Sequence, residues 1–130
     1  MASCAEAEGI AIGQGDAVLI RTGWQNTAPT QGPDYFRGEP GLGISGAEWL
    51  AERRVAAVGA DNYALEVLPS PGGSVFPVHL RLLRDYGTPI IEGLVLDALA
   101  DEHIKEFLFV AAPLPIAGGV GSPLMPIAIV

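Results

Sequence analysis

Short apolar runs bounded by glycine, proline or charged residues recur along this chain and predict buried strands. The runs at residues 16–22 and 55–60 have the β-branched, apolar character of such strands. A strongly apolar run at residues 107–112 predicts a central strand. An apolar stretch within residues 87–94 predicts a strand that carries Glu92, and residues 124–130 predict the last strand.

Three helices are predicted between these strands. Ser45 and Glu48 have the spacing of a capping box, in which each side chain bonds the other's backbone amide at a helix start. Residues 77–83 form a short amphipathic run that contains His79, and residues 97–106 form another with its charged side outward. Strands separated by short helices predict an α/β fold with a mixed sheet.

Composition narrows the classes of function. The 130 residues suit a single domain, residues 1–130, and the 49% hydrophobic content suggests surface buried between subunits. A net charge of −8 argues against nucleic acid. A membrane-spanning helix needs about 20 apolar residues, and no apolar run here is that long. The first residues do not resemble a signal peptide, so we expect a cytoplasmic protein. Cys4 is the only cysteine, which excludes a disulfide framework.

Candidate chemistry centres on His79 and Glu92. Thirteen positions and a turn separate them, so the helix and the strand that carry them can fold back and bring imidazole and carboxylate together. Nitrogen and carboxylate oxygen are half of a zinc or manganese site. The alternative is that His79 packs at a helix start while Glu92 faces water.

Three other segments are candidates for a ligand pocket. The proline- and glycine-rich stretch at residues 24–43 holds Trp24 and Tyr35, and ordered loops of this length are often functional. Asp61 follows a predicted strand, where open α/β sheets place ligands, although an aspartate there can also form a turn. The segment with Gly121 and Ser122 forms either an anion-binding nest or a plain turn.

The succession of segments resembles the C-terminal part of the cyclase family, in that family's own order and over nearly the whole chain. The segments are GDAVLIRTGW (15–24), PGL (40–42), WLAERRVAAVGADNYALE (49–66), PVHLRLLRDYGTPIIEGLVLDAL (77–99) and FLFVAAPLPIAGGVGSPLMPIAIV (107–130). This family comprises metal-dependent hydrolases that include kynurenine formamidases and isatin hydrolases. The resemblance implies a swivelling β/β/α fold, dimers or tetramers, and a divalent metal, zinc or manganese, that activates water against an amide.

The sequence departs from the pattern of this family in one respect. Family members have an upstream motif of the form His-x-Gly-Thr-His-x-Asp-x-Pro-x-His, whereas this sequence has only His79 and His103. His79 and Glu92 match the family's two downstream metal positions, and Asp61 matches an aspartate after the central strand. The chain therefore resembles an N-terminally truncated family member, which could be a short gene, a truncated reading frame or a fragment.

Two functions follow as hypotheses. The first is a metal-dependent hydrolase of an amide such as an N-formyl aromatic amine. In it His79 and Glu92 bind the metal, Glu66 or Asp61 substitutes for a missing ligand, and the remaining candidates wall a pocket for a small-molecule substrate: Trp24, Tyr35, Asp61, Gly121 and Ser122. The second is a non-catalytic remnant of the fold that oligomerises or binds a partner. Bound metal would favour the first, and a metal-free oligomer the second.

Overall fold

The computed structural model describes residues 1–27 and 32–130, which form two compact units, Met1–Leu96 and Asp97–Val130. Each unit is described by itself. The prediction of a single domain stays a prediction. Of the proline- and glycine-rich stretch at residues 24–43, the part at 28–31 lies outside the described residues.

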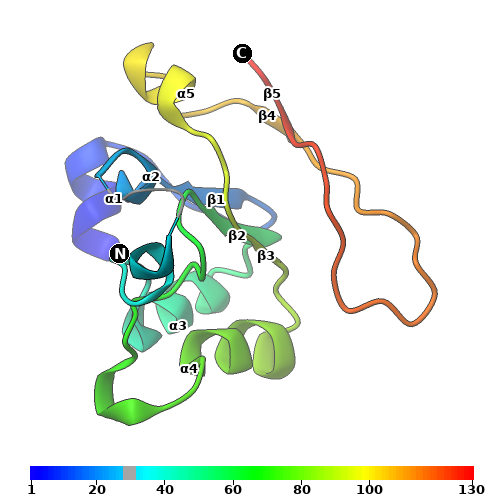
Figure 1. The fold of residues 1–130 in the computed structure, drawn as a ribbon. Helices are drawn as coiled ribbons and strands as arrows, with labels where there is room; N and C mark the ends of the chain where they lie inside the picture. Colours follow the sequence, from blue (N-terminus) through cyan, green and yellow to red (C-terminus); the bar gives the residue numbers. More distant parts are fainter. Residues whose placement is uncertain (28–31) are drawn as a thin grey trace. The chain divides into compact units, whose positions relative to one another are not determined.

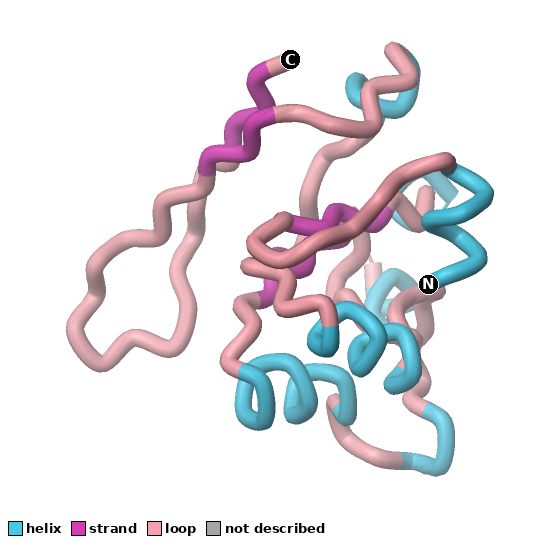
Figure 2. The backbone as a smooth tube through the Cα atoms, turned by 180° about the vertical axis from the view of Figure 1, so that it is seen from behind, coloured by secondary structure: helices cyan, strands magenta, loops and turns pink. Residues whose placement is uncertain are grey.

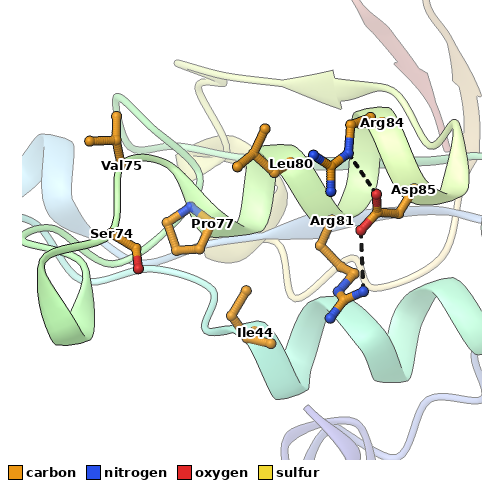
Figure 3. A pocket seen from close by; sticks show the side chains of 8 residues that line it. All are labelled: Ile44, Ser74, Val75, Pro77, Leu80, Arg81, Arg84 and Asp85. Carbon is orange, nitrogen blue, oxygen red and sulfur yellow. Dashed lines mark hydrogen bonds and ion pairs between the residues drawn. The ribbon is translucent and has the colours of Figure 1, made fainter.

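A three-stranded parallel sheet organises the first unit (Figures 1 and 2). Its strands are β1 (Ala17–Ile20), β2 (Ala57–Ala60) and β3 (Ile90–Ile91), in the order β1-β2-β3. Ala17 pairs with Ala57, and Val58 pairs with Ile90. The three predicted strands in this unit are therefore confirmed; β1 and β3 are shorter than predicted at both ends, and β2 only at its start.

Helices and turns fill the connections of this unit. They are listed here in chain order: α1 (Ala2–Glu8), α2 (Trp24–Thr27), η1 (Pro33–Phe36), α3 (Ile44–Glu52), η2 (Pro71–Gly73), α4 (Pro77–His79) and η3 (Leu80–Tyr86). The last two are continuous, and η3 is a π-helix that ends at Gly87, whose φ of 66° is left-handed. The predicted helix at residues 77–83 is thus confirmed and extends to Tyr86.

The core lies where α3 and the α4–η3 helix pack together against the sheet. Its centre consists of Leu50 from α3, Val58 from β2 and Leu82 from η3, none of which is exposed to solvent. The apolar spacing of α3 explains this packing, because Ala47, Leu50 and Ala51 lie on one side of the helix. This packing fixes α4, and with it His79, relative to the ends of the strands.

The predicted capping box is wrong. Helix α3 begins at Ile44 with Gly43 as its N-cap, and no side chain caps it. The carbonyl of Gly43 accepts the amides of Gly46 and Ala47, each at 3.0 Å, so Ser45 already lies inside the first turn. Glu48 instead pairs with Arg81 at 3.1 Å and thereby links α3 to η3.

The second unit contains α5 (Asp97–Asp101), β4 (Leu108–Val110) and β5 (Ile127–Ile129). The two strands pair antiparallel, with Phe109 opposite Ala128. The predicted strand at residues 107–112 is thus present as the shorter β4, but its expected central position is wrong, because β4 belongs to a two-stranded sheet. Prolines before β5 and after β4 lack the amide donors that would lengthen the ladder. Parallel and antiparallel strands thus occupy separate sheets.

No described helix is long and apolar enough to cross a membrane.

A close backbone approach fixes the segment that precedes α3. Leu42 forms a parallel bridge with Glu66, and a Cβ on Gly41 would lie 2.4 Å from the carbonyl carbon of Glu66. Backbone atoms cannot move aside as a flexible side chain can. Only glycine therefore fits at position 41 without a shift of the chain.

We expect Gly41→Ala to lower the free energy of unfolding by about 1–3 kcal/mol, the usual cost of overpacking. Urea denaturation followed by circular dichroism measures this. Gly121→Ala is the matched control, because a Cβ there meets no atom within 4 Å. Equal stability of the two variants would contradict the close approach.

Candidate active site

The predicted site residues of the first unit gather near the carboxyl ends of β2 and β3. Asp61 follows β2 directly, Glu92 follows β3, and His79 ends α4. The carboxyl ends of parallel strands meet at one edge of a sheet, where α/β folds place their ligands. The packing of α4 beside the ends of these strands therefore brings together a histidine and several acids that are distant in the sequence.

His79 is held from behind by Glu66. The Nδ1 atom of His79 lies 2.7 Å from Oε1 of Glu66, whose side chain is only 1% exposed. The same carboxylate accepts the backbone amides of Val78 at 3.1 Å and His79 at 3.2 Å. Phe76 packs edge-on against the imidazole, with ring centroids 5.0 Å apart. Both the ring and the first turn of α4 are thereby anchored.

The opposite edge of the imidazole ring contacts Glu92. His79 Nε2 lies 3.3 Å from Oε1 of Glu92, whose side chain is 41% exposed. The expected convergence of these two side chains is therefore present. Their role as metal ligands stays a prediction.

Asp61 ties two strand ends together. Its carboxylate accepts the amide of Thr22 at 2.8 Å, the hydroxyl of Thr22 at 2.6 Å and the amide of Gly23 at 2.8 Å. The carboxylate therefore does not close a local turn on its own backbone. It connects the end of β2 to the segment after β1, and its place in a substrate pocket stays a prediction.

Sequence reasoning missed Glu39, and it considered Glu66 only as a substitute ligand. Glu39 is 4% exposed and accepts the amides of Tyr63 at 2.9 Å and Ala64 at 2.7 Å. Burial raises the pKa of Glu39, the two amides lower it, and the carboxylates of Glu92 and Asp61 raise it further. The one available signal was its position between Gly38 and Pro40, in a stretch with few other charges.

The predicted pocket aromatics form a chain of ring contacts. Trp24 stacks on Tyr35 with centroids 6.2 Å apart, and Phe36 contacts both Tyr35 and Tyr63 edge-on. Burial raises the pKa of the Tyr35 phenol, and the negative charges of Glu39 and Asp61 raise it further. Tyr35 thus lies close enough to these two acids for their negative charges to affect its pKa.

Gly121 and Ser122 belong to the second unit. The Ser122 hydroxyl accepts the amide of Leu114 at 3.0 Å, across the loop between β4 and β5. In the same loop the amide of Gly119 donates to the carbonyl of Ile116 at 3.0 Å, a turn contact. The structure does not relate these residues to His79, so their role in the pocket stays a prediction.

Comparisons with known proteins identify the family of this chain. The family described as putative cyclase matches residues 1–67, more than half of the chain. The chain belongs to the cyclase family. It is 30% identical over 131 residues to the isatin hydrolase of Roseibium aggregatum, an alignment that covers 96% of this chain and 49% of that protein.

Two solved structures of the cyclase family have the same fold. A crystal structure of a novel cyclase has a TM-score of 0.83 at 35% identity and covers 98% of this chain and 44% of its own. An isatin hydrolase bound to the product analogue thioisatinate has a TM-score of 0.75 at 28% identity, with coverages of 99% and 50%. The chain therefore spans about half the length of these cyclase-family relatives.

The donor pair of this cyclase-family chain fits a divalent ion. Two neighbouring ligands at about 2.0–2.2 Å from a tetrahedral ion are about 3.3–3.6 Å apart, and His79 Nε2 and Glu92 Oε1 are 3.3 Å apart. The Glu66 carboxylate behind Nδ1 is the support that a metal-binding histidine usually has. Within residues 1–27 and 32–130, no third His, Cys, Asp or Glu side chain completes the group.

The two acids also change the basicity of the imidazole. The hydrogen bond to Glu92 raises the pKa of His79 most, and the bond to Glu66 raises it as well, although burial opposes both. A histidine whose pKa is higher in the folded than in the unfolded chain stabilises the fold fully below its unfolded pKa, about 6.5. That contribution is lost as the pH rises through the folded pKa.

We therefore expect His79→Gln to cost more stability at a pH of about 5.5 than at a pH of about 9. Urea denaturation of the chain in the presence of a chelator, at both pH values, measures the difference. His103→Gln, which removes the other, exposed histidine, is the control variant. A cost for His79→Gln that grows with pH would contradict the assignment.

Proposed function

We propose that this chain contributes His79 and Glu92 to the active site of a metal-dependent hydrolase that cleaves an amide of an aromatic amine, such as an N-formyl aromatic amine. The observation that carries the proposal is the 3.3 Å pair of His79 Nε2 and Glu92 Oε1, with Glu66 bonded to the opposite ring nitrogen. The similarity to an isatin hydrolase supports a hydrolase as the reaction class. Isatin and an N-formyl aromatic amine are the two substrate probes.

The roles of the residues follow from their contacts. His79 Nε2 and Glu92 Oε1 would hold zinc or manganese, which when bound supplies Lewis acidity and a water of lowered pKa. Glu66 keeps the imidazole in place, and Trp24, which stacks on the buried Tyr35, would form an aromatic wall of the substrate pocket. Two protein ligands leave most of the coordination sphere to water, so metal binding by this chain alone should be weak.

The first test is metal binding by titration calorimetry with zinc and with manganese. We expect a weak site in the chain, loss of binding in His79→Ala and Glu92→Gln, and no change in His103→Ala. Circular dichroism checks that each variant is folded. Binding that survives both site substitutions would reject this metal site.

Turnover of the two amide probes is measured on the same samples. We expect it to be absent or very low, since this sequence has no histidine base beside the pair. A rate of an ordinary enzyme, about 1–1,000 per second, would show that the pair needs no further histidine.

A second candidate function, a module that joins copies of this chain, is favoured by the distribution of charge. All 22 charged side chains lie within residues 1–106, so residues 107–130 carry none. Copies with a net charge of −8 repel one another wherever their charged surfaces meet. The uncharged segment, with Val110 at 43% and Ile129 at 53% exposure, is where a second copy meets no such repulsion.

Light scattering tests this second function. We expect a dimer or tetramer at micromolar concentration, and a smaller species for Val110→Glu, because a charge placed in an apolar interface must be desolvated. Val75→Glu is the control, since Val75 is 76% exposed in the first unit. A monodisperse monomer of the unsubstituted chain would contradict self-association.

A further inference from the structure

We infer that Glu66 is the positioning residue of His79 and fixes the imidazole as the tautomer that carries its proton on Nδ1. In the neutral ring Nε2 is then the acceptor nitrogen, so its 3.3 Å contact with the partly exposed Glu92 carboxylate is a hydrogen bond only while the ring is protonated. The value of this arrangement for metal binding depends on the function proposed above. The tautomer itself does not depend on it.

The position of Glu66 is set by its backbone. Gly41 and Leu42 lie against it on one side, through the close approach and the bridge described above. On the other side Leu65 adopts a φ of 57°, a left-handed conformation that is uncommon for a bulky residue. Leu65 is fully buried, so packing offsets the cost of this conformation. The backbone thus directs the Glu66 carboxylate inward.

Inside the protein the carboxylate has three hydrogen-bond partners. Oε2 accepts the amide of Val78 at 3.1 Å, and Oε1 accepts the amide of His79 at 3.2 Å and lies 2.7 Å from Nδ1 of the same residue. Both oxygens of this carboxylate already accept backbone amides, so we take it as an acceptor toward the ring as well. The donor in the 2.7 Å contact is therefore Nδ1–H.

The chemistry of imidazole then determines the protonation state of the other ring nitrogen, Nε2. A neutral histidine has one donor and one acceptor nitrogen, so a proton held on Nδ1 makes Nε2 the acceptor. A free histidine in water favours the opposite tautomer, and the exposed His103 provides that reference within the same chain. The edge-on contact with Phe76 restrains the plane of the His79 ring. Among the described residues, Glu66 is the side chain that contacts Nδ1.

The test is nitrogen NMR of the chain labelled with ¹⁵N in its two histidines, in chelator at an alkaline pH where both rings are neutral. Protonated and unprotonated ring nitrogens have widely separated shifts. We expect His79 to show a protonated Nδ1 and an unprotonated Nε2, and His103 to show the opposite preference. A His79 spectrum like that of His103 would overturn the inference.

Two isosteric variants separate positioning from stability. Glu66→Gln presents an amide that can donate to Nδ1 or accept from it, so the Nδ1–H preference should be lost in the folded variant. Glu92→Gln removes the acid on the other side and should keep the preference. Retention in Glu66→Gln, or loss in Glu92→Gln alone, would contradict the role of Glu66. If Glu66→Gln does not fold, the unsubstituted chain and Glu92→Gln still decide the question.

These outcomes are independent of the proposed function. If calorimetry detects no metal but the Nδ1–H tautomer is present, the metal proposal fails and the positioning by Glu66 stands. If metal binds, Glu66→Gln should weaken it by about 10–100-fold, as loss of a carboxylate behind a ligating histidine usually does. Metal binding without the expected tautomer would reject the positioning role alone.

Discussion

The buried carboxylate of Glu66 is the constraint on which the site depends. A carboxylate with 1% of its side chain exposed must be hydrogen-bonded, because leaving it without partners would cost several kcal/mol. Its donors come from Val78 and His79, twelve and thirteen residues further along the chain. Satisfying the carboxylate therefore requires that the start of α4 and the His79 ring lie beside it. The core contacts of Val78 and Leu82 hold α4 there.

Three buried acids follow the same physical pattern. Glu39, Asp61 and Glu66 each accept two backbone amides from a segment that is distant in the sequence. Hydrogen bonds to charged groups contribute about 1.5–3 kcal/mol each. Glu39 and Asp61 thereby fix loops, whereas Glu66 fixes the first turn of α4. The loops at the carboxyl ends of the strands are thus positioned by polar contacts, α3 and η3 by the apolar core, and α4 by both.

This division explains how much could be predicted from the sequence. The strands around Val58 and Ile90 follow from local apolarity, and the convergence of His79 with Glu92 follows from a turn of known length. The capping box fails because Gly43, two residues earlier, already supplies the carbonyl that starts α3. The run at residues 107–112 reads as central because apolarity alone does not say whether anything covers a strand.

The roles of Glu39 and Glu66 could not be predicted from the sequence for a different reason. In a sequence a buried glutamate looks like a surface glutamate, since its donors are backbone amides that every residue except proline carries. Only the three-dimensional path of the chain shows that the amides of Tyr63 and Ala64 meet Glu39. A left-handed Leu65 before Glu66 is equally invisible, because leucine gives no sign of an unusual φ.

Burial finally separates the roles of the two acids that face His79. Glu66 is enclosed and already accepts two amides, so it has no freedom to turn toward a ligand in solvent. Glu92 is 41% exposed and lies on the Nε2 side, with space to exchange its contact with the ring for a contact with an ion or water. One imidazole can therefore be oriented from its buried side and remain chemically available on its open side, which is the arrangement a ligand histidine needs.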